Sequence, residues 1–179
     1  MRGTRTANKG SGAILGLIVP LTERRDAMAP FVPFDQLPDM YKNLLEKARE
    51  ALELSYHPHG AEQLSVGAAV LTKNGKVYTG SNIEIAGLSS SICAERSTLA
   101  TAHNGGDGDQ CVAIGIVTRN PNNEPTPEVS YPCGVCRQVL GEFANRSGSE
   151  EGFVIVTATT NFDQVFLTTV GELMPHFYR

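Results

Sequence analysis

Two short cysteine motifs mark this chain: Cys93-Ala94-Glu95-Arg96 and, with its first cysteine forty residues after Cys93, Pro132-Cys133-Gly134-Val135-Cys136. Three sulfur ligands leave the fourth position of a tetrahedral zinc ion open for water, as in a catalytic site, whereas a structural site usually closes with a fourth Cys or His. The remaining cysteine, Cys111, lies inside an apolar run and is better explained as a small core residue. The motifs therefore predict one catalytic zinc ion held by Cys93, Cys133 and Cys136.

Both motifs are expected at helix N-termini, where unpaired N–H groups and the helix dipole stabilise thiolates. Glu95 follows Cys93 by two residues, so its carboxyl can lie beside the metal without binding it. The alternatives are a structural zinc site or free thiols. A disulfide framework fits poorly, because a chain of 179 residues can bury a sufficient core without cross-links and carries no convincing secretory signal.

The segments around the motifs alternate between helical and strand patterns. Apolar residues recur at helical spacing in some segments, while others are short apolar runs bounded by turn residues. The run at 111–118 is apolar throughout, which predicts a strand in the middle of a sheet. The order favours an α/β fold with a mixed sheet and helices on its faces. The expected helices are 34–54, 91–103, 133–144 and 170–174. The expected strands are 64–72, 76–83, 111–118, 153–159 and 164–169, of which the first two form a hairpin around Asn74-Gly75. The expected loops are 55–63 and 119–131.

Length and charge narrow the class of protein. The chain carries a net charge of -4, and residues 1–27 hold five basic and two acidic side chains, a balance of +3 that leaves -7 for the rest. An acidic folded part argues against a nucleic-acid partner, and the absence of any run of about 20 apolar residues argues against a membrane partner. We expect a disordered leader or tag over 1–30 and a single domain over 31–179.

Further pieces accompany the cysteine motifs. Cys-x-Glu followed by Pro-Cys-x-x-Cys is typical of zinc-dependent base deaminases. The other pieces are Val66-Gly67-Ala68-Ala69, Gly80-Ser81-Asn82-Ile83-Glu84 and Glu172-Leu173-Met174-Pro175. Together they span roughly residues 37–177, and in this order they resemble the homotetrameric cytidine deaminases. The resemblance implies a cytidine-deaminase-like three-layer fold with a mixed five-stranded sheet and helices on both faces, a homotetramer, and a cytoplasmic enzyme of pyrimidine salvage.

The resemblance also implies a function, the zinc-dependent hydrolysis of cytidine or deoxycytidine to the uracil nucleoside and ammonia. In this implied reaction, Glu95 carries protons between water, ring N3 and the departing amine. The implied roles are zinc ligation for Cys93, Cys133 and Cys136; ribose binding for Asn82 and Glu84; a backbone contact to the base for Ala94; hydrogen bonding to the cysteine sulfurs for Arg96; and, for Phe177, reaching into the site of a neighbouring subunit.

One motif departs from the family. Where relatives carry Pro-Tyr-Ser-x-Phe before Val-Gly-Ala-Ala, this chain has Gly60-Ala61-Glu62-Gln63-Leu64, so Leu64 takes the place of an aromatic under the base. The departure leaves the preferred nucleoside open, with an antibiotic nucleoside such as blasticidin S as the first alternative.

Other interpretations stay open on the sequence alone. A nucleic-acid base deaminase conflicts with the acidic charge, and an inactive zinc-stabilised binding protein conflicts with the intact Glu95. Asn82 and Glu84 are also compatible with a solvated strand end, and Arg96 with an ordinary helix surface. His57 and His59 are expected to face solvent around Pro58 rather than to bind a second metal.

Overall fold

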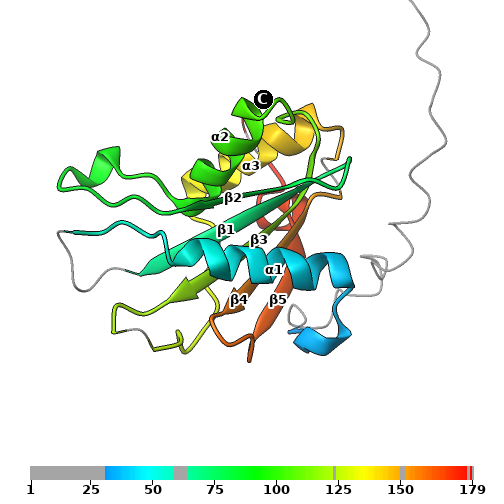
Figure 1. Cartoon of the computed structure of the whole chain (residues 1–179). Helices are drawn as coiled ribbons and strands as arrows, with labels where there is room; N and C mark the ends of the chain where they lie inside the picture. The colour runs from blue at the N-terminus through cyan, green and yellow to red at the C-terminus, as the bar shows by residue number, and fades with distance from the viewer. Residues whose placement is uncertain (1–30, 59–63, 123, 150–151, 177, 179) are drawn as a thin grey trace, which may run out of the picture.

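The central strand of the sheet is the one that the apolar run predicted. The computed structural model describes residues 31–58, 64–122, 124–149, 152–176 and 178. Its five-stranded sheet has the order β2-β1-β3-β4-β5 (Figure 1). The elements are α1 (Asp39–Leu52), β1 (Ser65–Thr72), β2 (Val77–Ser81), α2 (Ala94–Asn104), β3 (Cys111–Arg119), α3 (Gly134–Arg146), β4 (Val154–Thr159), β5 (Val165–Thr169) and α4 (Val170–Leu173), with 3-10 turns η3 (Phe34–Gln36) and η4 (Leu88–Ser90).

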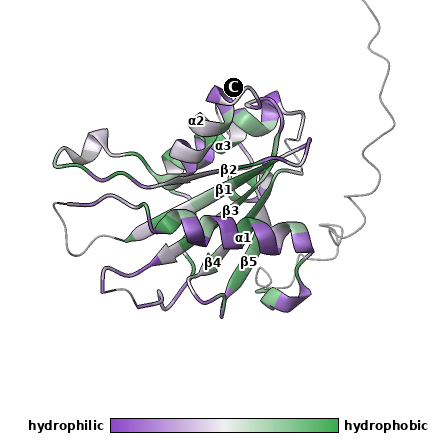
Figure 2. Cartoon of the chain, in the orientation of Figure 1, coloured by the Kyte–Doolittle hydropathy of each residue, from purple (hydrophilic) through white to green (hydrophobic). Residues whose placement is uncertain are grey.

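The sheet is mixed, as predicted. β3 pairs antiparallel with β1 and parallel with β4, while β2 and β5 pair antiparallel at the two edges. Helix α1 covers one face of the sheet, and α2 and α3 cover the other. Figure 2 shows the resulting distribution, with hydrophobic strands in the middle and a hydrophilic outer side on α1. The three-layer α/β fold expected from the sequence is confirmed.

Helix α1 approaches the sheet closely because Gly67 has no side chain. A Cβ at Gly67 would lie 2.0 Å from the Ala48 carbonyl oxygen. This contact gives the Val66-Gly67 motif a physical reason and lets Leu44, Leu45 and Leu52 pack into the core beneath α1. Replacing Gly67 would force the helix away from β1.

Several predicted boundaries were wrong. Helix α2 begins at Ala94 rather than residue 91, and β2 ends at Ser81 rather than residue 83, because Ile83 and Ile92 pair with each other in an isolated β-bridge. Helix α1 begins at Asp39 rather than residue 34, because Leu37 precedes Pro38 and takes an extended conformation (φ -68°, ψ 147°), which separates η3 from the helix. The hairpin turn contains three residues rather than two: the Thr72 N–H donates to the Lys76 carbonyl at 3.0 Å. Gly75 has a φ of 82°, which fits a type I turn closed by a left-handed glycine.

The second core lies between the sheet and the two helices that follow the cysteine motifs. Leu99 of α2 and Leu140 of α3 pack with Phe153 and Ile155 on this face, and the buried Cys111 belongs to the same cluster, as expected. The packing fixes α2 and α3 side by side, so the residues at their N-terminal ends are held on a common framework. No helix in the described ranges has the length and apolar character that crossing a bilayer requires.

Candidate active site

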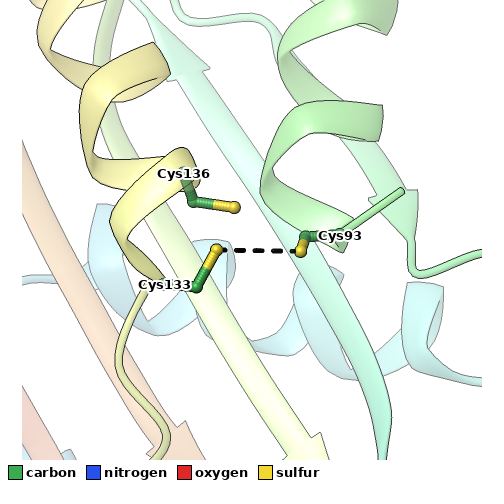
Figure 3. Close-up of side chains that lie close together, drawn as sticks. All are labelled: Cys93, Cys133 and Cys136. Atoms are coloured by element: carbon green, nitrogen blue, oxygen red, sulfur yellow. Dashed lines mark hydrogen bonds between the residues drawn. The ribbon is translucent and has the colours of Figure 1, made fainter. Parts of the chain in front are cut away.

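The three predicted zinc ligands converge at the N-terminal ends of α2 and α3. Cys93 is the N-cap residue of α2, Cys133 is the N-cap residue of α3, and Cys136 lies in the first turn of α3. Figure 3 shows their side chains turned toward a common point. The Cys93 and Cys133 sulfurs are 4.0 Å apart, and all three sulfurs lie within 4.8 Å of one another.

These distances fit a tetrahedral zinc ion. Zn–S bonds of about 2.3 Å place two sulfurs about 3.8 Å apart, so closing the site requires only small side-chain movements. Cys136 is buried, Cys93 is half-buried and Cys133 is exposed. The burial therefore leaves the cluster accessible on the side of Cys133. Among the described residues this is the only cluster of three or more His, Cys, Asp or Glu side chains placed to hold a metal.

Among the three cysteines, Cys93 is the one whose surroundings favour the thiolate. A hydrogen bond with Cys136, assisted by the Arg96 guanidinium and by Cys133, lowers the pKa of Cys93 to about 5. The hydrogen bond to Cys93 and burial raise the pKa of Cys136. The first thiolate of the site is thus Cys93, and metal binding would displace the proton that Cys136 holds.

Arg96 lies on the first turn of α2, facing back over the cluster. One of its Nη atoms donates to the Ser91 carbonyl at 2.9 Å and lies 3.9 Å from the Cys93 sulfur. The side chain is therefore not an ordinary surface arginine. A cation at this place partly offsets the charge of three thiolates, which would otherwise make a bound water less acidic.

Glu95 is the second residue of α2 and is only 6% exposed. Burial raises the pKa of its carboxyl; its own backbone N–H lowers it, and the negative charge of Cys93 raises it further. A buried carboxyl whose pKa is raised holds a proton more readily than an exposed one, which suits it to general acid–base catalysis. It stands beside the cluster without being part of it, as the two-residue spacing suggested.

Asn82 lies at the end of β2 and is 3% exposed, so it is not a solvated strand end. Its Oδ1 accepts hydrogen bonds from the Ser55 hydroxyl and, at 2.9 Å, from the Val66 N–H. Its Nδ2 donates to the Leu64 carbonyl at 3.0 Å and points toward Glu84 Oε1 at 3.5 Å. Asn82 and Glu84 are therefore adjacent, as the Asn-x-Glu motif requires.

Other predicted site residues have definite places. Ala94 is buried as the first residue of α2, and Leu64 is 38% exposed, immediately before β1. His57 Nε2 lies 3.0 Å from the Ser65 hydroxyl, a local contact outside the cysteine cluster. His59, Phe177 and the expected leader over 1–30 lie outside the described residues.

Sequence reasoning missed two features near the site. Ser55 bonds Asn82, but a serine in a loop carries no signal of such a partner. Gln138, two residues after Cys136, donates to the Tyr178 carbonyl at 2.7 Å and accepts from the Tyr178 N–H at 3.1 Å. The neighbouring Arg137 donates to the Pro132 carbonyl at 2.8 Å and to the Leu173 carbonyl at 3.3 Å. The C-terminal segment is thus attached to α3 next to the zinc ligands.

Several known proteins are similar to this chain. Residues 39–147 match the family model for the cytidine and deoxycytidylate deaminase zinc-binding region. The chain is 33% identical over 135 residues to a cytidine deaminase of Sporosarcina psychrophila, covering 75% of this chain and 88% of that protein. It is 27% identical over 138 residues to a blasticidin-S deaminase of Bacillus cereus, covering 75% of this chain and 89% of that protein.

A solved structure agrees with these sequence matches. The cytidine deaminase of Burkholderia pseudomallei superposes with a TM-score of 0.64 at 33% identity, covering 76% of this chain and 97% of the other. The matched family region contains all three cysteines and Glu95. The cysteine cluster, which could hold a metal ion, lies within the zinc-binding region of this family, and the chain belongs to the cytidine and deoxycytidylate deaminases.

Proposed function

We propose that this protein hydrolyses cytidine or deoxycytidine to the corresponding uracil nucleoside and ammonia, in a zinc-dependent reaction. The observation that carries the proposal is the buried Glu95 carboxyl beside a cluster of three sulfurs that remains accessible at Cys133. Such an enzyme would serve pyrimidine salvage in the cytoplasm.

Glu95 performs the proton transfers of the reaction. When bound, the zinc ion supplies the Lewis acidity that makes water a nucleophile at neutral pH. Glu95 accepts a proton from the water that adds to C4 of cytosine and donates it to ring N3. It next takes the proton of the new C4 hydroxyl and delivers it to the exocyclic amine. The C4–N bond then breaks, ammonia leaves, and the ring carries a carbonyl at C4 and a hydrogen on N3.

The remaining predicted residues, apart from Arg96, would bind the nucleoside. Glu84, with Asn82 beside it, would accept a hydrogen bond from a ribose hydroxyl, and the Ala94 backbone would contact the base. Arg96 would hydrogen-bond the metal-bound sulfurs, and Phe177 would reach the site of a neighbouring copy.

A substrate panel tests the proposed function. Zinc-loaded protein is incubated with cytidine, deoxycytidine, N4-modified cytidine and blasticidin S, with single-stranded DNA as the polymer control, and the uracil product is quantified. We expect turnover of cytidine and deoxycytidine and none of the DNA. Turnover of blasticidin S alone would mean that the substrate is the antibiotic nucleoside rather than cytidine. No turnover of any compound would contradict the proposed function.

The antibiotic nucleoside remains the second candidate because of Leu64. A leucine offers dispersion but no planar face, whereas stacking of an aromatic on a base is worth about 1 to 3 kcal/mol. The Leu64 carbonyl is held by Asn82, so its position before β1 is fixed. A base site without an aromatic would bind cytidine weakly and tolerate substituents on the ring or its exocyclic nitrogen.

Leu64→Phe is expected to lower the KM for cytidine by about 3- to 10-fold and to narrow the range of accepted analogues, because it restores a stacking face. Steady-state kinetics with cytidine and an N4-substituted analogue measure both effects. Met40→Phe is the control, since Met40 is 42% exposed on α1. Unchanged Michaelis constants for both substrates would show that Leu64 does not lie under the base. His57 or His59, in the loop expected over 55–63, would then become the first candidates to cover the ring.

We further propose a homotetramer. Apolar side chains lie exposed on segments that pair with one another near the site: Tyr56 is 53% exposed, Ile83 39% and Ile92 38%. Covering such a patch with another copy of the chain would remove apolar surface from water. Light scattering on the active protein should therefore give the mass of four chains, and a fully active monomer of 19.2 kDa would contradict this.

A further inference from the structure

Asn82 is bonded at every hydrogen-bonding position that a primary amide offers. A side-chain amide has two acceptor lone pairs and two N–H donors. In Asn82 both lone pairs are used, by Ser55 and Val66, and one N–H is used by Leu64. The second N–H points toward the Glu84 carboxylate at a long 3.5 Å. That N–H is therefore the only part of Asn82 with a weak partner.

The spacing of this last pair suits a sugar hydroxyl. A hydroxyl donates one hydrogen bond and accepts others, so it can donate to a carboxylate while accepting from an amide N–H. Asn82 Nδ2 and Glu84 Oε1 offer one donor and one acceptor, adjacent to each other and half-open to solvent at Glu84. The two groups can bind the same hydroxyl only while the amide keeps its present orientation.

Three groups set that orientation. Two belong to the backbone of residues 64–66. The third is the Ser55 hydroxyl, and it alone comes from the segment that follows α1. That segment is also tied by its backbone: the Tyr56 N–H donates to the Asn82 carbonyl at 3.0 Å, and the Glu84 N–H donates to the Tyr56 carbonyl at 2.6 Å. In Figure 1 the chain leaving α1 accordingly runs beside the chain leaving β2.

We infer that Ser55 is a positioning residue for the sugar side of the site: through Asn82 it fixes the amide N–H and the Glu84 carboxylate that together bind one hydroxyl of the nucleoside. The inference rests on the proposed function, because it needs a nucleoside in the site. The Ser55 hydroxyl bonds Asn82 rather than a zinc ligand, and in this inference it acts on the substrate only through Asn82. Its loss should therefore weaken substrate binding and leave the proton transfers of Glu95 intact.

Kinetics with a hydroxyl-deleted substrate test this role. Ser55→Ala is expected to raise the KM for cytidine by about 3- to 10-fold, the effect of one hydrogen bond, with kcat within about twofold of wild type. With 2′,3′-dideoxycytidine, which lacks the 2′- and 3′-hydroxyls of the ribose, Ser55→Ala and wild type should have the same kcat/KM. Ser55→Thr, which keeps a hydroxyl, should restore the KM for cytidine.

Ser149→Ala is the matched control. Ser149 is also partly buried and hydrogen-bonded to backbone carbonyls, those of Cys111 and Ala144, at the opposite end of β3. It should lose a similar amount of stability, measured by thermal unfolding, without any change in KM.

Two outcomes would overturn the inference alone while wild type still deaminates cytidine. One is an unchanged KM for cytidine in Ser55→Ala. The other is an equal loss for cytidine and for the dideoxy analogue, which would mean that Ser55 merely supports the fold. No turnover of cytidine by wild type would overturn the proposed function and the inference with it.

Discussion

Glu95→Ala is expected to lower kcat for cytidine by about 10⁴-fold or more while zinc content and melting temperature stay near those of wild type. In the proposed reaction the side chain transfers protons during both addition and elimination, and each such transfer is worth roughly 10² to 10⁴. It is not part of the candidate metal cluster, which consists of the three cysteine sulfurs. Turnover, metal analysis and thermal unfolding on the same preparation measure the three quantities.

Glu142→Ala is the control, because Glu142 is an exposed carboxylate on α3. Glu95→Gln tests the proton transfer itself, since it keeps the size of the side chain and removes the acid. Loss of less than about tenfold in either Glu95 variant would mean that another group moves the protons.

Cys93→Ala should lose the metal together with part of the stability of the fold. Cys93 caps α2, while Cys133 and Cys136 belong to the start of α3, so a zinc ion held by all three would join two helices that share one face of the sheet. A ligand present at 1,000 times its Kd stabilises the folded state by about 4 kcal/mol. For a chain of this size that corresponds to a melting temperature lower by about 8 to 16 °C in the variant.

Metal analysis of protein purified without added zinc distinguishes this account from a structural role of the sulfur. Wild type should hold about one zinc ion per chain and Cys93→Ala almost none. Cys111→Ser should keep its zinc, because Cys111 is buried in the core and its thiol lies 3.7 Å from the Asp107 carbonyl, outside the cluster. Zinc loss in Cys111→Ser with retention in Cys93→Ala would reverse the assignment.

The zinc site and the core were predictable because short-range patterns encode them. The Cys-x-x-Cys spacing places two sulfurs on one helical turn, and an apolar run such as β3 has no polar face to expose, so it lies at the centre of the sheet. Several boundaries were not predicted. Pro38 keeps Leu37 extended, so the helix does not begin at Phe34 even though the spacing of the apolar residues is helical from there. Gly75 takes a left-handed conformation, which adds a third residue to the hairpin turn.

The substrate side of the site was less accessible to prediction. The partners of Asn82 lie 27 residues away at Ser55 and 18 at Leu64, and nothing local in the sequence marks those pairings. The contact between Gln138 and Tyr178 spans 40 residues. Such contacts depend on how the layers pack, so they become visible only once α1, the sheet and α3 are placed.

In the proposed function, the three-cysteine site and Glu95 together remove ammonia from cytidine. The most direct measurement quantifies uridine and ammonia together when zinc-loaded protein is incubated with cytidine, with Glu95→Ala as the parallel sample. We predict that wild type forms the two products in equal amounts over many turnovers, and that the variant, equally folded and equally loaded with zinc, forms almost none. The absence of both products from folded, zinc-loaded wild type, or their equal formation by Glu95→Ala, would contradict the account.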